Sequence, residues 1–144
     1  MNDGSLSVRG WMARKQLYRK RQAMVGAMQR AGVGILAGTD LANPYLIPGF
    51  SLHDELAILV ECGLTPMQAL QAATRNPARF LGREQEPGTL QKGSLADLVL
   101  LDADPLADIR NVTQVRAVVA DGRFYDRTAL DRLLTEAEAA ANRE

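Results

Sequence analysis

An aspartate and a histidine are the residues of this sequence whose chemistry is most easily interpreted. Asp40 ends the run VGILAGTD, which starts at Val33 and is otherwise small or apolar, and His53 is the only histidine. A carboxylate can take a proton from water, and both types of side chain bind metals in hydrolytic sites. Taken alone, an aspartate here favours a turn or a helix cap, and a lone histidine in the first turn of a helix favours the protein surface.

The remaining polar candidates have structural interpretations that are at least as good as their chemical ones. Thr39 and Asn43 flank Asp40 and could bind a ligand, although turn-forming roles are more typical of them. Asp97, in the run ADLVLL, favours fixing a turn or a strand end over binding a metal. The sequence has no His-x-His pair, and its single cysteine, Cys62, excludes an intrachain disulfide.

Composition favours one globular domain with no nucleic-acid or membrane partner. The chain has 144 residues, of which 47% are hydrophobic, and seventeen basic residues balance seventeen acidic ones. Residues 1–32 hold seven basic residues and one acid, a charge of +6, and residues 33–144 carry −6. The basic stretch RKQLYRKR, residues 14–21, favours a solvated helix face, because no aromatic platform accompanies it. No apolar run reaches about 18 residues and no apolar leader begins the chain, so a cytoplasmic location is expected.

Asp40 is expected at the end of a helix–strand unit. Apolar residues at helical spacing predict a helix over 13–31, with Gly32 after its last turn. The apolar run 33–37 then predicts a short buried strand, and this order is typical of a parallel α/β sheet. The carboxylate of Asp40 would follow that strand directly.

Three helix starts follow within about thirty residues. After a loop over 41–50, Ser51 is the expected N-cap of a helix that reaches about Cys62. Thr65 begins a second helix with a capping-box pattern, and this helix ends near residue 75. A short helical turn over 76–82 completes the group. The apolar residues expected to face inward in the first of these helices are Leu52, Leu56, Leu59 and Val60.

The pattern changes to period two from Gly88 onward. A turn at Lys92–Gly93 precedes a strand over 96–101, which is apolar on both sides and should be covered on both faces. The stretch VRAVVADGRFYD predicts a hairpin with Asp121–Gly122 as its turn. Thr128 is the expected cap of a last helix, whose inward residues would be Leu130, Leu133, Leu134 and Ala137. The change in composition near 84–88 predicts a division into residues 1–84, 85–127 and 128–144.

Four stretches in this order resemble the C-terminal portion of the amidohydrolase superfamily, especially its imidazolonepropionase-like and prolidase-like members. They are AGVGILAGTD (31–40), GFSLHDELAILVECGLTPMQALQAATRNPARFLG (49–82), GTLQKGSLADLVLLDADPLADI (88–109) and VRAVVADGRFY (115–125). The resemblance implies an α/β fold: the last helix and last strand of a TIM barrel, the helices after them, and a small C-terminal β-region with a terminal helix.

The same resemblance implies a function. Members of this superfamily hydrolyse amide, cyclic amide or related C–N bonds of small molecules with water activated by zinc or another divalent metal. Asp40 matches the aspartate that binds or faces the metal and handles the proton of that water, and the C-terminal end of a barrel strand is where such enzymes place chemistry. His53, within SLHDEL, matches a position that faces the substrate.

The sequence also departs from the family pattern. The family's other metal ligands are histidines and a modified lysine on earlier strands, and a barrel needs about 200 residues or more. The chain is therefore interpreted as the last part of an amidohydrolase that is not active alone. The metal belongs to the complete site of the family, and this chain lacks most of its ligands. Because strand 33–37 would have unpaired edges, we expect self-association or a partner chain that supplies the rest of the barrel. The alternative is a non-catalytic interaction module or subunit derived from an amidohydrolase.

Overall fold

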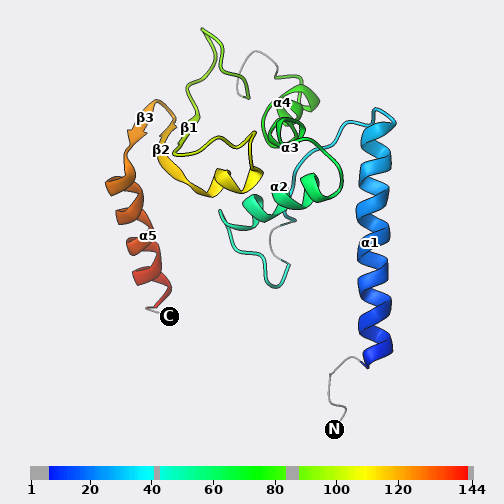
Figure 1. Cartoon of the computed structure of the whole chain (residues 1–144). Helices are drawn as coiled ribbons and strands as arrows, with labels where there is room; N and C mark the ends of the chain where they lie inside the picture. Colours follow the sequence, from blue (N-terminus) through cyan, green and yellow to red (C-terminus); the bar gives the residue numbers. More distant parts are fainter. Residues whose placement is uncertain (1–6, 41–42, 84–87, 143–144) are drawn as a thin grey trace.

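A computed structural model of the chain describes residues 7–40, 43–83 and 88–142. In these ranges the chain forms five α-helices, one 3-10 helix and a three-stranded antiparallel sheet, which is a mixed α/β structure (Figure 1). Residues 84–87, near which a boundary is predicted, lie outside the described ranges. In chain order the elements are α1 (Val8–Arg30), α2 (Ser51–Glu61), α3 (Pro66–Ala73), α4 (Arg75–Phe80), β1 (Leu98–Leu101), η1 (Ile109–Thr113), β2 (Val115–Ala120), β3 (Arg123–Tyr125) and α5 (Arg127–Ala141).

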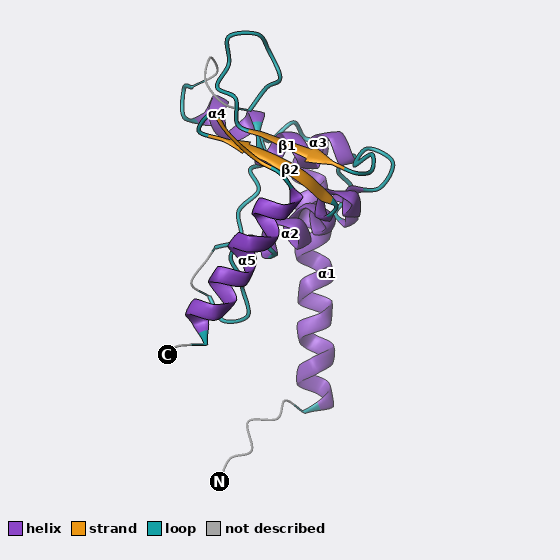
Figure 2. Ribbon diagram, turned by 90° about the vertical axis from the view of Figure 1, so that its left-hand side faces the viewer, coloured by secondary structure: helices purple, strands orange, loops and turns teal. Residues whose placement is uncertain are grey.

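Helix α1 is longer than the sequence predicts, and its N-terminal half projects from the rest of the structure (Figures 1 and 2). It begins at Val8 because the Ser7 hydroxyl accepts a hydrogen bond from the Gly10 amide and caps the first turn. Gly26 is its one buried residue, and a Cβ there would clash with the Cys62 carbonyl oxygen. The last turns of α1 therefore pack closely on the end of α2.

The predicted buried strand over 33–37 is wrong. These residues are extended but form no strand, and Val33 and Leu36 are exposed. The physical reason is that a strand needs a strand beside it, and the sheet of the described residues is built from residues 98–125 instead. The segment forms hydrogen bonds with α3 and α4 and not with a neighbouring strand.

The three helices that follow begin and end close to the predicted positions. Thr65 and Gln68 form the predicted capping box, in which the Thr65 hydroxyl accepts from the Gln68 amide. The prediction for Ser51 is wrong: it is the first residue of α2, and its hydroxyl accepts from the Ile47 amide in the preceding loop. Leu52, predicted to face inward, is 40% exposed, whereas Leu56 and Leu59 are buried.

The β-region confirms the predicted hairpin but not the predicted burial. Strand β2 pairs with β1 and with β3, and Asp121 and Gly122 turn the hairpin with φ values of 50° and 72°. Strand β1 is shorter than expected, and it is not covered on both faces, because Val99 and Leu100 are 60% and 56% exposed. A three-stranded sheet with few elements around it cannot bury both faces.

Helix α5 also differs from its prediction in cap and burial. Asp126, not Thr128, caps the helix by accepting from the Ala129 amide. No residue of α5 is buried, and Leu133 and Leu134 are 49% and 52% exposed. The predicted amphipathic pattern is present, and α5 contacts β2 and β3, but these strands leave most of its apolar side exposed.

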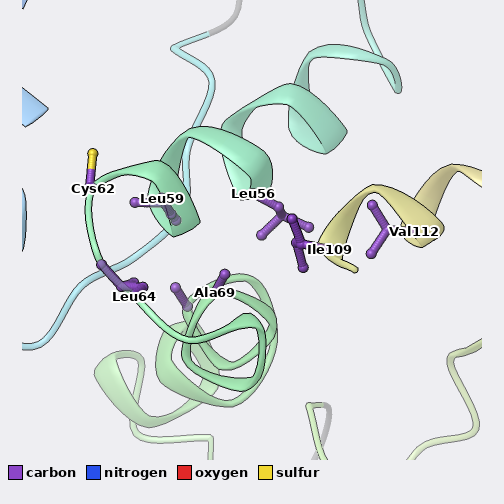
Figure 3. Close-up of a cluster of buried hydrophobic side chains, with 8 residues drawn as sticks. Leu56, Leu59, Cys62, Leu64, Ala69, Ile109 and Val112 are labelled. Atoms are coloured by element: carbon purple, nitrogen blue, oxygen red, sulfur yellow. The ribbon is translucent and has the colours of Figure 1, made fainter. Parts of the chain in front are cut away.

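One small hydrophobic core connects the helices to the C-terminal region (Figure 3). Ile109 and Val112 of η1 lie beside Leu56 of α2 in this cluster. The cluster therefore joins residues on both sides of the predicted boundary, and the division into 1–84, 85–127 and 128–144 stays a prediction. Its members are Leu56, Leu59, Cys62, Leu64, Ala69, Ala72, Ile109 and Val112.

The chain exposes more surface than a compact monomer of its size. Its accessible area is 11419 Å² for 15.7 kDa, against about 7,300 Å² expected. The residues outside the described ranges could account for at most about 2,200 Å², the area of a fully unfolded stretch of that length, which leaves an excess of about 1,900 Å². None of the helices in the described ranges is both long and apolar enough to cross a membrane.

Candidate functional site

Two hydrogen bonds from α3 and α4 fix the extended segment that leads to Asp40. The Ala37 amide donates to the Ala72 carbonyl oxygen at 2.9 Å, and the Asn76 side-chain amide donates to the Ile35 carbonyl oxygen at 3.0 Å. Ile35 and Ala37 also pack against the hydrophobic core. The segment is thus held by its backbone and by alternate side chains, and Asp40 lies three residues beyond the second anchor.

Asp40 has a left-handed backbone conformation, and one of its two carboxylate oxygens accepts a hydrogen bond. Its φ is 52°, its side chain is exposed, and its Oδ2 accepts a hydrogen bond of 2.7 Å from the Asn43 side-chain amide. The same amide donates to the Asp40 carbonyl oxygen at 3.0 Å. Asn43 therefore forms a turn, as its residue type predicts, and orients the carboxylate at the same time. Within the described residues, Oδ1 of Asp40 has no hydrogen-bond donor.

His53 lies where the sequence predicts, in the first turn of α2, but it does not interact directly with Asp40. Its backbone amide donates to the Phe50 carbonyl oxygen at 3.0 Å, and its side chain is half-buried. In the part of the chain that the structure describes, no hydrogen bond or ion pair joins His53 to Asp40. The structure thus brings Asn43 to Asp40 and leaves His53 on the neighbouring helix.

The described residues do not form a metal site by themselves. Within 7–40, 43–83 and 88–142, no group of three or more His, Cys, Asp or Glu side chains lies close enough to hold a metal ion. Burial raises the pKa of the Cys62 thiol, and the charges of Glu61 and Glu55 raise it further, so this cysteine stays neutral and is a poor metal ligand. The described residues therefore do not fit a bound zinc ion without ligands from elsewhere.

Asp97 has the structural role that the sequence favours for it. Its Oδ1 accepts a hydrogen bond of 2.8 Å from the Asp121 amide, which lies in the β2–β3 turn. Asp121 has a positive φ, so this bond supports the conformation that the turn requires. The prediction that Asp97 fixes a turn is confirmed.

Asn76 is the residue of this region that the sequence analysis misses. The pair Asn76–Pro77 predicts the start of a helix, and α4 does begin there, one residue earlier. The side chain, however, bonds a backbone carbonyl 41 residues away in the sequence. The available signal is only that asparagine often bonds the backbone near helix starts, and this does not identify so distant a partner.

Comparisons with known proteins identify the family. Residues 12–125 match the amidohydrolase family model, so the chain belongs to the amidohydrolase family. It is 33% identical to an imidazolonepropionase of Aeromonas hydrophila over 99 residues, which cover 67% of this chain and 23% of the relative. It is 40% identical to an ochratoxinase of Aspergillus niger over 115 residues, covering 72% of this chain and 22% of the relative.

Solved structures support the same assignment. A Xaa-Pro dipeptidase with bound methionine matches with a TM-score of 0.66 and 30% identity over 73% of this chain and 25% of that structure. An amidohydrolase from Thermotoga maritima matches with a TM-score of 0.58 and 26% identity over 74% of this chain and 26% of that structure. The chain spans about a quarter of the length of these relatives.

Proposed function

We propose that this chain is the C-terminal segment of a metal-dependent amidohydrolase, and that it contributes Asp40 to the active site. The observation that carries the proposal is the anchoring of segment 33–40 to α3 and α4, which presents one carboxylate at the end of an extended stretch. Family membership and coverage of about a quarter of each relative support it. In this proposal segment 33–37, which forms no strand in the described structure, would take the position of the last barrel strand once another strand pairs with it, with α1 before it and α2 to α4 after it.

The proposed chemistry is hydrolysis of an amide, cyclic amide or related C–N bond in a small molecule. Asp40 would take the proton of the attacking water, and the Asn43 amide would hold one carboxylate oxygen so that Oδ1 faces the reaction. His53, half-buried on the helix after the Asp40 loop, would contact the substrate. Zinc or another divalent metal requires ligands beyond those of the described residues.

Completion of the site requires more chain than the described residues provide. Segment 33–37 lies extended with no strand beside it, and an extended backbone accepts a pairing strand readily. The missing strands would come from a partner chain or from further residues of the same protein. Large apolar side chains exposed on the segment, such as Leu36 at 42%, would then be covered.

A second candidate function is a non-catalytic interaction module. The exposed apolar sides of α1 and α5 favour it, because they offer binding surface without using Asp40. The two functions differ in what they require: hydrolysis needs the Asp40 carboxylate, whereas the module needs only the surface.

A hybrid enzyme tests the proposal. This chain would replace the matched quarter of the Xaa-Pro dipeptidase, and metal content and cleavage of a Xaa-Pro dipeptide would be measured together. Asp40→Asn should reduce both, while the matched change Asp102→Asn, at an exposed carboxylate in the C-terminal region, should reduce neither. An active hybrid in which Asp40→Asn has no effect would contradict the proposal. A folded hybrid without metal or activity would favour the interaction module.

A further inference from the structure

Two helices of this protein have apolar sides that the described structure leaves largely exposed, although α5 contacts β2 and β3 and its Leu130 is half-buried. Helix α1 has one buried residue, Gly26, and α5 has none. The N-terminal half of α1 and the length of α5 project on opposite sides of the central helices and sheet (Figure 1). The two exposed surfaces therefore cannot cover one another within a single chain.

The exposed surface of α1 combines aromatic and basic side chains. A shallow hollow on the helix is lined by Trp11, Met12, Arg14, Lys15 and Tyr18, which we call the α1 surface. Trp11 is 63% exposed and is followed directly by Met12, and the other three members of the set lie one or two helical turns further along. Helix α1 carries seven basic residues and no acid, and none of its basic side chains forms an ion pair within the described ranges.

The exposed surface of α5 combines leucines with acids. Helical spacing places Leu130, Leu133, Leu134 and Ala137 on one stripe, which we call the α5 surface. By the same spacing, Glu136 and Glu138 lie on either side of this stripe. Neither glutamate forms an ion pair with another described residue. A leucine stripe bordered by acids is complementary to an aromatic hollow bordered by bases.

We propose that the occupant of each surface is a second copy of this chain. The α1 surface of one copy packs on the α5 surface of the other, and the reverse contact forms across a twofold axis. A twofold arrangement buries both surfaces of both copies and gives a closed dimer. If each copy instead used its α1 surface on one neighbour and its α5 surface on another, the assembly would be an open chain. The proposal uses neither Asp40 nor segment 33–40, so variants in the α1 and α5 surfaces test it separately from the role proposed for Asp40.

Charge and area both favour a second copy as the occupant. Helix α1 carries seven basic residues and no acid, and Glu136 and Glu138 border the α5 surface, so the two surfaces attract each other while the whole chains, with no net charge, do not repel. A stable interface buries about 800 Å² on each partner. The whole-chain excess of exposed area, about 1,900 Å², is large enough to include an interface of this size.

The first test is the mass of the purified full chain by sedimentation over a wide concentration range. We expect a monomer–dimer equilibrium in which Trp11→Ala and Leu133→Ala each weaken dimerisation at least tenfold, about 1.4 kcal/mol. Phe80→Ala is the matched control, because Phe80 on α4 is 76% exposed and belongs to neither surface. Its dimerisation constant should equal that of the parent, and circular dichroism should show equal helix content in all variants.

A charge exchange provides the second test. Lys15→Glu and Glu136→Lys should each weaken the dimer, their combination should restore part of the loss, and Lys92→Glu, in a turn outside both surfaces, should have no effect. Added salt should weaken the parent dimer. A chain that stays monomeric at every concentration would overturn the proposal. So would assemblies whose constants Trp11→Ala and Leu133→Ala leave unchanged, because association would then use other surfaces, such as the extended segment 33–37.

Discussion

Removing the Asn76 side-chain amide should loosen the segment that carries Asp40. Asn76 donates to the Ile35 carbonyl oxygen at 3.0 Å, and the Ala37 amide bonds the Ala72 carbonyl oxygen two residues later. The variant Asn76→Ala deletes the first anchor and leaves the second in place. Alanine forms helices better than asparagine, so the substitution does not weaken α4 itself.

The size of the effect follows from the one bond that is lost. A typical intramolecular hydrogen bond contributes about 1 kcal/mol net, and an acceptor left without a partner costs more when it is buried. Ile35 is half-buried, so part of this cost is relieved by water. We therefore expect the segment to open more easily by about 1–2 kcal/mol, which corresponds to a population change of about 5- to 30-fold.

Amide hydrogen exchange at Ala37 measures this opening directly, because its amide is protected by the neighbouring bond to Ala72. The Ala37 amide should exchange faster in Asn76→Ala by about the factor given above. Asn111→Ala is the matched control, since the Asn111 side-chain amide also donates to a backbone oxygen, that of Asp104, at 2.7 Å. The control should leave exchange at Ala37 unchanged. Equal exchange at Ala37 in Asn76→Ala and the parent would refute the anchoring role.

Three further outcomes are expected from the same structure. Gly88→Ala should lower the free energy of unfolding by about 2–5 kcal/mol, measured by urea titration, because φ is +100° and the new Cβ would lie 2.7 Å from the Thr74 carbonyl oxygen. Asp97→Ala should cost about 1–2 kcal/mol by losing the acceptor for the Asp121 amide, and Asp97→Asn should cost less because it retains an oxygen. Burial raises the pKa of the Cys62 thiol in the folded protein, so its contribution to stability is complete below the unfolded pKa and is lost as the pH rises through the folded value. The urea midpoint should fall more steeply above about pH 8.5 in the parent than in Cys62→Ala, and equal slopes would contradict this.

Local signals in the sequence predict the helix and hairpin boundaries well. The capping box at Thr65 and the Asp121–Gly122 turn depend on a few adjacent residues, and the structure confirms both. Where two local candidates compete, the sequence does not decide between them. Asp126 caps α5 in place of Thr128, because an aspartate is at least as good a cap and begins the helix earlier.

Predictions that depend on distant parts of the chain are less successful. Apolar patterns predict which side of α5 and which strand should be buried, but burial also requires a partner surface. The described residues cover only part of α5 and one side of segment 33–37, so both stay more exposed than their patterns suggest. The Asn76 anchor is missed for a related reason, since its acceptor is brought near only by the fold.

The anchors at Ile35 and Ala37 have a consequence for how the Asp40 site would be completed. Helices α3 and α4 hold segment 33–40 extended although no strand lies beside it in the described structure. Because the segment is already ordered, pairing it with another strand would cost less conformational entropy than pairing a flexible segment. The alignment of Asp40 would then depend on contacts within this chain, with the partner strand supplying the missing ligands. Loosening the Asn76 anchor should consequently weaken assembly of the hybrid enzyme as well as exchange protection at Ala37, because both depend on the same ordered segment.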